Sequence, residues 1–370
     1  MHPIRSVAIG VRNINTKSGL GKIVLEQIQY YLKQGVAVDI YTHKYDENIK
    51  NTGVNIVKIF KVPFVNEYLQ RLLFAKFAQH KISKKKYDLV IGHGDLMKQD
   101  VLFLHNLVER AYQYKYNKPM DPLNHLAKFR RHMLMSNAYR LLIANSKLMK
   151  DDLIQEFHIA EDKIKIIYPG YDPKQFNTDN AKSVKERMRQ QLNVDASVVL
   201  IGFITSGDLK KRALSLFLEA LHELETTVEY KVLLVAKDGN IGQYLQEAKD
   251  LGVDDKLILR DPIDNVEEYF HAVDFTVHPA YFEEFGMVVQ EAMACGLGVI
   301  TSKRVGASEI MLDQSVVMEK PNKAELTKYI KEMLENRERK ESIAQYSRDS
   351  VKNTTWDHYM KKFNHEIEQL

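Results

Sequence analysis

Residues 278–301 read HPAYFEEFGMVVQEAMACGLGVIT and place two glutamates, Glu283 and Glu291, on either side of a glycine turn. The residues before the turn are typical of a strand, and MVVQEAMACG is typical of a helix closed by Gly296. Because most neighbours of Glu291 are apolar, its carboxylate is expected on or beside a buried face. A buried carboxylate needs a partner, so Glu291 predicts a bound group that donates hydrogen bonds, such as sugar hydroxyls. The alternative is a solvated acid on the outer face of the helix.

Strand and helix patterns alternate on both sides of this stretch. Residues 6–42 run from the strand SVAIGV through the helix SGLGKIVLEQIQYYLKQG to the strand VAVDIYT. The strands YDLVIGHG, VLFLHN and RLLIANS follow, and a second series runs from VVLIGFI to GVITS and SVVME. This alternation predicts an α/β fold with two doubly wound, largely parallel sheets covered by helices.

A polar stretch with proline and glycine at residues 170–196 interrupts the alternation and is interpreted as the link between domains. We therefore expect Rossmann-like domains at residues 1–169 and 170–350, and a C-terminal helix at residues 351–370 that packs back on the N-terminal domain. That helix carries apolar side chains at helical spacing, namely Trp356, Tyr359, Met360 and Phe363.

The composition is that of a soluble globular protein, with 45% hydrophobic and 28% charged residues in a chain of 370. No apolar run approaches the roughly 20 residues that a membrane-spanning helix needs, and the start of the chain lacks a secretory signal pattern. The single cysteine, Cys295, excludes an internal disulfide framework and indicates a reducing compartment. Its apolar helix predicts a buried structural thiol. We expect a cytoplasmic location.

Charge is distributed unevenly along the chain. Residues 1–150 hold 25 Lys and Arg against 10 Asp and Glu, whereas the rest of the chain holds 28 against 39. HLAKFRRHMLM at residues 125–135 has the pattern of an amphipathic helix that can lie among lipid headgroups. The alternative is a helix that packs its apolar side inward and solvates its charges. No recognisable nucleic-acid module accompanies the charge, so no nucleic-acid partner is expected.

Two other loops are candidates for binding an anion. NTKSGLGKI at residues 15–23 places Ser18 and Gly19 at a helix start, where backbone N–H groups bind phosphates. A simple tight turn explains these residues as well. TSGDLKKRALS at residues 205–215 places Lys210, Lys211 and Arg212 near an expected helix start. Cations are unfavourable there unless an anion such as a diphosphate is bound, and the alternative is a solvated basic turn.

EEFGMVVQE at residues 283–291 resembles the E-x7-E signature of the retaining glycosyltransferases of group 1, also called family 4. The GT-B fold of that family has two facing Rossmann-like domains with a cleft between them. Residues 18–42 and 144–176 are similar to further segments of the family, so the resemblance covers nearly the whole chain. Residues 275–301 look closest to the bacterial lipopolysaccharide-core glucosyltransferase branch.

The resemblance implies a hexosyltransferase that takes its sugar from a nucleotide diphosphate sugar donor, expected to be a UDP-hexose. The acceptor it implies is a glycan or lipid-linked glycan, such as lipopolysaccharide core. The excess of basic residues in 1–150 predicts that the N-terminal domain binds an anionic acceptor, with peripheral contact to the anionic inner face of the plasma membrane. Catalytic roles fall on Glu283, His105 and Arg212. Donor binding falls on a larger set: Ser18, Gly19, Lys211, Phe285, Gly286, Met287, Val288 and Glu291.

No cofactor and no metal are expected, because the chain contains no Asp-x-Asp sequence of the kind that holds metal in the other major glycosyltransferase fold. Three positions depart from the family pattern: Gly207 replaces a usual arginine, Glu284 replaces a glycine, and Gly298 replaces a frequent proline. Two alternatives stay open, a non-catalytic or weakly active nucleotide-sugar-binding relative and a UDP-sugar epimerase. A nicotinamide dehydrogenase is not expected, since no G-x-G-x-x-G follows the first strand of either half.

Overall fold

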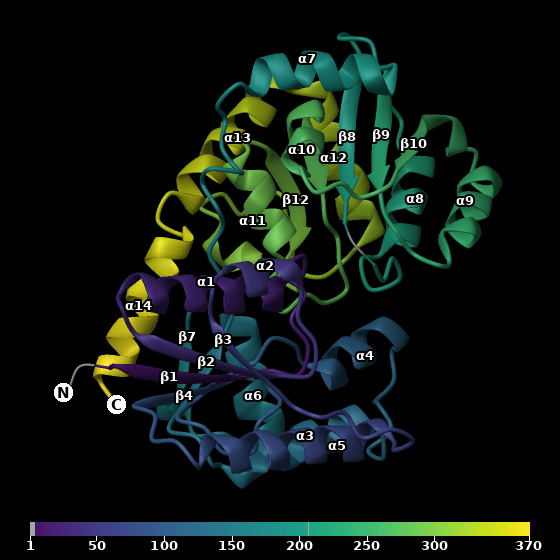
Figure 1. Cartoon of the computed structure of the whole chain (residues 1–370). Coiled ribbons are helices and arrows are strands. Elements are labelled where there is room, and N and C mark those ends of the chain that lie inside the picture. The colour runs from purple at the N-terminus through teal and green to yellow at the C-terminus, as the bar shows by residue number, and fades with distance from the viewer. Residues whose placement is uncertain (1–3, 206) are drawn as a thin grey trace. The chain divides into compact units, whose positions relative to one another are not determined.

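The computed structural model describes residues 4–205 and 207–370, and the chain divides into two compact units (Figure 1). Unit 1 consists of Met1–Pro169 together with Trp356–Leu370, and unit 2 consists of Gly170–Thr355. The chain therefore returns to unit 1 at Trp356, and residues 351–355 lie in unit 2. In the part of the chain that the structure describes, no helix combines the length and apolar content needed to cross a membrane.

Unit 1 is built on a seven-stranded sheet in which every neighbouring pair is parallel, in the order β3-β2-β1-β4-β5-β6-β7. In its centre Val7 lies opposite Val38 on one side and Leu89 on the other. The strands are β1 (Ser6–Gly10), β2 (Ala37–Thr42), β3 (Asn55–Lys58), β4 (Leu89–Gly92), β5 (Val101–Phe103), β6 (Leu141–Ala144) and β7 (Ile164–Ile166). The helices are α1 (Gly19–Lys33), α2 (Glu47–Asn51), α3 (Glu67–Ile82), α4 (Val108–Tyr116), α5 (His125–Ser136), α6 (Lys147–Phe157) and α14 (Trp356–Glu368).

Helix α1 shows how local sequence sets an element. The Ser18 side chain accepts a hydrogen bond from the Gly21 N–H at 3.1 Å and so caps the first turn. Gly35 has a φ of 73° and ends the helix in the left-handed conformation that glycine adopts without strain. Helices α1 and α14 lie on one face of the sheet, and α3 and α5 on the other (Figure 1). On α14, Phe363 packs edge-on against Phe103 with ring centres 4.9 Å apart.

Helix α5 is the segment expected to be amphipathic, and its apolar side is buried within unit 1. Phe129 and Met133 are each 1% exposed, and Leu134 is 2% exposed. Arg130 is also buried, hydrogen-bonded to Asn106 and ion-paired with Glu109 at 3.0 Å. The interpretation of this helix as one that inserts among lipid headgroups is therefore wrong, because its apolar side chains already form part of a protein core.

Unit 2 contains a second parallel sheet, in the order β10-β9-β8-β11-β12-β13. The core on one side of this sheet includes Phe217, Phe275, Ile300 and Met333, all without exposed surface. The strands are β8 (Val199–Ile204), β9 (Tyr230–Val235), β10 (Leu257–Arg260), β11 (Phe275–Val277), β12 (Gly298–Ser302) and β13 (Val317–Met318). The helices are α7 (Ala181–Leu192), α8 (Leu214–His222), α9 (Ile241–Asp250), α10 (Glu267–Ala272), α11 (Met287–Ala294), α12 (Lys323–Glu335) and α13 (Arg337–Val351).

Residues 170–196, interpreted from the sequence as a link, contain helix α7, which packs on α10 inside unit 2. The apolar pattern in the sequence of α7 is weak, and ionic contacts contribute much of its attachment to unit 2. Arg189, 6% exposed, lies 2.5 Å from Asp274, and its Nε donates to the Ala272 carbonyl at 3.0 Å. The interpretation as a link is therefore wrong for residues 181–192. An ion pair helps to attach this helix, and such a contact leaves no hydrophobic pattern in the sequence.

Both sheets reverse their strand order beside their first strand, between β1 and β4 in unit 1 and between β8 and β11 in unit 2. In open parallel sheets, ligands bind outside the carboxyl ends of the strands at such a reversal. The loops at these positions carry Arg12 and Asp95 in unit 1, and Arg212 and Glu283 in unit 2.

Candidate functional site

The loops after β8 and β11 of unit 2 bring together two cations and two acids. Lys211 Nζ lies 3.0 Å from a Glu284 carboxylate oxygen, and the Arg212 guanidinium is ion-paired with Glu283. Arg212 Nε also donates to the Thr205 hydroxyl at 3.1 Å. The loops themselves are joined by the Tyr281 N–H, which donates to the Lys211 carbonyl at 2.9 Å. Four residues predicted from the sequence, or flagged there as departures, therefore form one cluster.

The backbone around Glu283 is held on both sides. Its N–H donates to the Arg304 carbonyl at 2.8 Å, and its carbonyl accepts from the Gly306 N–H at 3.0 Å. The following turn passes through Gly286, whose φ of 91° suits glycine, and a Cβ at this position would lie 2.9 Å from a Val305 methyl. This turn therefore sets the direction in which α11 begins and fixes Glu283 at the carboxyl edge of the sheet.

Burial lowers the pKa of two basic groups in this cluster. Burial lowers the pKa of Arg212 to about 10, against opposing effects of Glu284 and Asp208. Burial also lowers the pKa of His278 well below its usual value, and Arg212 and Lys211 lower it further, so His278 is neutral at pH 7. His278 follows β11 directly and was not predicted, although its place as the first polar residue after an apolar strand was the available signal.

Within residues 4–205 and 207–370, the buried Nε2 of His278 makes no hydrogen bond. Arg212 and Glu283 are in ionic contact, and His278 Nε2 lies 3.8 Å from the Glu283 carboxylate. Buried polar atoms in native proteins are normally hydrogen-bonded to protein or water. His278 Nε2 is therefore able to form a further hydrogen bond with a bound group.

Helix α11 begins after this turn and carries the second predicted glutamate. Glu291 is 6% exposed, which confirms that its side chain lies on a buried face. Cys295 is buried too, and burial, followed by the charge of Glu291, raises the pKa of its thiol. The thiol is therefore structural, as predicted. Gly296 closes the helix with a φ of 83°.

The basic loop and the departures from the family pattern also have defined positions. Helix α8 begins at Leu214, so Lys211 and Arg212 lie in the loop directly before it, near the helix start as expected. Gly207 has a φ of 68° and open space around its Cα. At Gly298, by contrast, a Cβ would lie 2.7 Å from the Met333 terminal methyl, so close packing of α12 against β12 explains this glycine.

Three predicted site residues belong to unit 1. The Ser18 hydroxyl donates to the Asn15 carbonyl at 2.7 Å while it caps α1, so the tight-turn explanation is sufficient for its conformation. Gly19 is the first residue of that helix and is exposed. His105 follows β5, is half-buried, and has its Nε2 2.8 Å from Nδ1 of His93.

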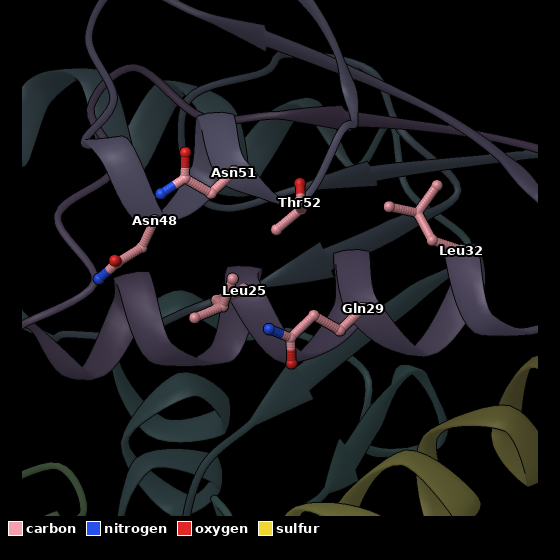
Figure 2. Close-up of a pocket in the computed structure, with 6 residues that line it drawn as sticks. All are labelled: Leu25, Gln29, Leu32, Asn48, Asn51 and Thr52. Carbon is pink, nitrogen blue, oxygen red and sulfur yellow. The ribbon is translucent and has the colours of Figure 1, made fainter.

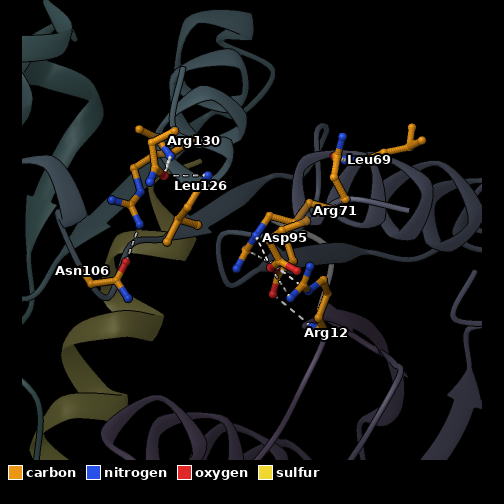
Figure 3. A network of polar contacts seen from close by, with 11 residues as sticks. Arg12, Leu69, Arg71, Asp95, Asn106, Leu126 and Arg130 are labelled. Atoms are coloured by element: carbon orange, nitrogen blue, oxygen red, sulfur yellow. Dashed lines mark hydrogen bonds and ion pairs between the residues drawn. The ribbon is translucent and has the colours of Figure 1, made fainter. Parts of the chain in front are cut away.

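A second charged network in unit 1, not predicted from the sequence, surrounds Asp95. Figure 3 shows this side chain between Arg12 and Arg71. One Asp95 oxygen accepts from Arg71 at 2.9 Å, and the other accepts from the Arg12 backbone N–H at 3.0 Å. Glu67 accepts from both guanidinium groups, at 2.8 Å from Arg12 and 3.0 Å from Arg71. Each carboxylate here is therefore shared by two arginines.

An open groove between α1 and α2 in unit 1 lacks such groups (Figure 2). Its lining side chains are apolar or uncharged: Leu25, Gln29, Leu32, Asn48, Asn51 and Thr52. Without an acid, base or cation it offers nothing for a diphosphate or a proton transfer. Within the described ranges, no group of three or more His, Cys, Asp or Glu side chains is arranged to hold a metal ion.

Comparison with known proteins agrees with this architecture. The sequence matches the family Glycosyl transferases group 1 over residues 149–350 and Glycosyltransferase Family 4 over residues 17–175. The chain therefore belongs to the group 1 glycosyl transferases, and it is a glycosyltransferase.

Individual relatives are distant. The chain is 26% identical over 301 residues to an uncharacterized glycosyltransferase of Methanocaldococcus jannaschii, covering 76% of this chain and 75% of that protein. It is 23% identical over 374 residues to a D-inositol 3-phosphate glycosyltransferase of Corynebacterium aurimucosum, covering 91% and 88%. To the lipopolysaccharide 1,2-N-acetylglucosaminetransferase of Salmonella typhimurium it is 27% identical over 227 residues, covering 58% and 57%.

Two solved structures show the shared fold. WaaG, a glycosyltransferase involved in lipopolysaccharide biosynthesis, matches with a TM-score of 0.82 and 18% identity over 96% of this chain and 98% of that one. Anabaena Alr3699/HepE in complex with UDP matches with a TM-score of 0.78 and 17% identity over 99% and 100%. The predicted GT-B class, with two Rossmann-like parallel-sheet domains, is thereby confirmed.

Proposed function

We propose that the protein is a retaining hexosyltransferase that moves a hexose from a nucleotide diphosphate sugar, a UDP-hexose, to a glycan or lipid-linked glycan. The observation that carries this proposal is the cluster in unit 2, where Arg212 and Lys211 lie beside Glu283 at the carboxyl edge of a Rossmann-like sheet. Cations there suit a diphosphate, and acids suit sugar hydroxyls. The Anabaena structure, which binds UDP and in another crystal UDP-glucose, supports this donor class.

In the proposed reaction, the bond between the anomeric carbon and a diphosphate oxygen breaks, and an acceptor oxygen bonds to the same face of that carbon. The departing diphosphate oxygen takes the acceptor proton. Negative charge grows on that oxygen as the bond breaks, so Arg212, with Lys211 beside it, stabilises the transition state more than the bound donor. Glu283 holds the hexose and Glu291 the ribose hydroxyls. Phosphate and sugar oxygens accept hydrogen bonds from the backbone at Phe285, Gly286, Met287 and Val288.

Unit 1 supplies the remaining proposed roles. His105 contacts the donor hexose, and the helix start at Ser18 and Gly19 contributes N–H groups to the diphosphate. The acceptor is an anionic or lipid-linked glycan recognised by the basic unit, of the kind found in lipopolysaccharide core. Because the apolar side of α5 is buried, contact with an anionic membrane has to rest on exposed lysines such as Lys81, Lys84 and Lys86. The protein then works in the cytoplasm at the inner face of the plasma membrane.

Metal independence is part of the proposal, because Arg212 and Lys211 supply the positive charge that a metal ion supplies elsewhere. Transfer measured after treatment with EDTA is expected to equal that of untreated protein. Loss of transfer that manganese restores would contradict metal independence without affecting the donor assignment.

The decisive experiment begins with a thermal-shift screen of nucleotide sugars and continues with Glu291→Gln in titration calorimetry. We expect one UDP-hexose to stabilise the wild-type protein and to bind Glu291→Gln at least about tenfold more weakly, because a charge-assisted hydrogen bond is lost. Glu247→Gln is the matched control, since Glu247 is a half-buried acid of unit 2 that accepts a hydrogen bond from Ser215 at 2.8 Å. Equal affinity in Glu291→Gln and wild type would overturn the role of Glu291.

A non-catalytic or weakly active nucleotide-sugar-binding protein is the second candidate. Gly207 supplies no cation, and Lys211 is ion-paired with Glu284. The site therefore holds less net positive charge than the family pattern implies. A binder of this kind would show donor affinity in calorimetry without release of nucleoside diphosphate from donor and acceptor together. Product analysis of the same mixtures separates the third possibility, a UDP-sugar epimerase, because only epimerisation converts the donor without an acceptor.

A further inference from the structure

A line of polar side chains in unit 1 leads from His105 into the protein interior. His105 Nε2 is 2.8 Å from His93 Nδ1, and His93 Nε2 is 3.0 Å from the Gln27 side-chain oxygen. His93 and Gln27 are buried, whereas His105 is half-buried. The members come from three elements that are far apart in the sequence: the end of β5, the end of β4, and α1.

The two imidazole rings are arranged for a direct hydrogen bond. Their planes differ by 13° and their centres are 5.1 Å apart. This separation exceeds the nitrogen-to-nitrogen distance by about two ring radii, so the rings meet edge to edge and the shared proton lies near both ring planes. The Phe103 ring lies within 15° of parallel to His93, with centres 5.1 Å apart, and restricts rotation of the imidazole.

The buried end of the line sets the direction in which the protons point. The Gln27 amide lies near the Tyr359 hydroxyl, and burial raises the pKa of this phenol. The Gln27 amide oxygen, and not its nitrogen, faces His93 Nε2 at 3.0 Å. That oxygen can only accept, so His93 carries its proton on Nε2 and its Nδ1 must accept from His105.

We propose that Gln27 and His93 are positioning residues that hold neutral His105 with its proton on Nε2 and with Nδ1 bare. His105 then accepts a hydrogen bond from a hydroxyl group of its ligand and cannot donate one. Burial lowers the pKa of His105 to about 4, which agrees with a neutral ring at pH 7. The inference rests on the proposed function only for the identity of that ligand, the donor hexose.

The proton positions can be measured without any substrate. Nitrogen-15 NMR of histidine-labelled full-length protein, with His105→Asn and His93→Asn used for assignment, reports which ring nitrogen carries the proton. We expect both rings to have a single form protonated on Nε2. A proton on Nδ1 of His105, or rapid exchange between the two forms, would overturn the proposal even if the protein proves to be an active transferase.

Two substitutions at Gln27 separate positioning from packing. Gln27→Met removes the acceptor at nearly constant shape, so His93 is expected to lose its single form and the KM for the donor is expected to rise about tenfold with kcat little changed. Gln27→Glu retains an oxygen that accepts from His93 and is expected to restore the Nε2 form and most of the donor affinity. Equal KM values in both variants would mean that Gln27 serves packing alone.

His43→Asn is the matched control for a buried histidine in the same unit. His43 is half-buried and bonds through Nδ1 to the Ile59 carbonyl at 2.9 Å, outside the line that ends at His105. This variant is expected to lose thermal stability while it keeps the wild-type KM. A rise in KM as large as that of Gln27→Met would show that any defect in unit 1 weakens donor binding, and the positioning role would be withdrawn.

If the protein binds no UDP-hexose, the NMR experiment still tests the proton positions of His93 and His105, because it needs no ligand. Where UDP-glucose binds, its monodeoxyfluoro analogues test the direction of the hydrogen bond in calorimetry. Fluorine cannot donate, so replacement of the hydroxyl that meets His105 is expected to weaken binding as much as its complete removal does. An analogue set in which fluorine always preserves the affinity that the deoxy sugar loses would contradict an accepting His105.

Discussion

The charged networks of the two units lie at equivalent places, beside the strand reversal of a parallel sheet, and differ in how completely their atoms are paired. Around Asp95 in unit 1, each carboxylate is shared between two arginines at distances of 2.8–3.0 Å. Around Glu283 in unit 2, the carboxylate pairs with one arginine, Arg212, and the buried Nε2 of His278 has no hydrogen bond among the described residues.

The pKa shifts express the same difference. Burial raises the pKa of Glu67 in unit 1, but the hydrogen bond and charge of Arg12 and the charge of Arg71 outweigh it, so the pKa falls overall. In unit 2, burial lowers the pKa of Arg212 to about 10 despite the acids beside it. The first network stabilises its charges and thereby the fold, whereas the second penalises a buried cation. A bound anion would remove that penalty, which is how a ligand site differs from a structural network.

The largest expected effect comes from Arg212→Ala in the unit 2 network. We expect kcat to fall at least about 100-fold, or roughly 3 kcal/mol of transition-state stabilisation, because the cation acts on charge that develops as the donor bond breaks. Affinity for uridine monophosphate should change much less. Calorimetry with that nucleotide and initial rates at saturating donor measure the two quantities. A drop in nucleotide affinity as large as the drop in kcat would remove the transition-state role.

Asp95→Ala breaks the complete network of unit 1. Two arginines then share only Glu67, so the free energy of unfolding is expected to fall by about 2 kcal/mol. Urea unfolding followed by circular dichroism measures the change. Glu47→Ala, an exposed acid of the same unit, is the control and should alter stability by less than about 0.5 kcal/mol. If Asp95→Ala were as stable as wild type, the contrast between the two networks would lose its basis.

Glu284→Gln sharpens the contrast in the opposite direction. It removes the acid that lies 3.0 Å from Lys211 and so makes that cation available to a diphosphate. Affinity for UDP is expected to rise about fivefold, or roughly 1 kcal/mol, with an increased dependence on salt. Glu268→Gln serves as the control in calorimetry. Glu268 lies on α10 and is the ion-pair partner of Arg187 on α7. Weaker UDP binding by Glu284→Gln would show that this acid contacts the donor favourably.

The smallest effect concerns acid pH. The folded-state pKa of Glu67 lies below its ordinary value of 4.5, so its contribution to stability is present above pH 4.5 and is lost as the pH falls through the folded value. Wild type and Glu67→Gln should therefore differ in their urea midpoints at pH 7 and converge as the pH falls through the folded-state pKa of Glu67. A constant difference across this range would mean that the charge of Glu67 does not contribute.

Much of this architecture follows from local patterns in the sequence. Apolar runs and glycine positions predicted the doubly wound class, and the apolar surroundings of Glu291 predicted its burial. These two predictions succeed because a strand or an apolar helix face is determined by residues near one another in the chain. The same reasoning missed α7, since its attachment depends on Arg189 meeting Asp274, a residue 85 positions away.

The candidate site was predicted unevenly for a similar reason. Glu283 and Arg212 were found through a motif, and the structure brings them into contact. His93 and Gln27 were not predicted. They are 66 positions apart, and no sequence pattern indicates their contact, which forms only when the fold brings the end of β4 beside α1. The unsatisfied Nε2 of His278 beside Glu283 could not be predicted either, since the completeness of a hydrogen-bond network depends on three-dimensional geometry.

The division of the chain has a consequence for synthesis on the ribosome. Unit 2 is continuous from Gly170 to Thr355, whereas unit 1 needs the segment from Trp356 onward. That segment emerges only after all of unit 2 has been translated, and it brings Phe363 to Phe103 and the Tyr359 hydroxyl to Gln27. The nascent unit 1 must therefore wait with the surface for α14 uncovered, a period in which chaperones can bind it. Unit 1 is therefore the first to be translated, and its fold is the last to be completed.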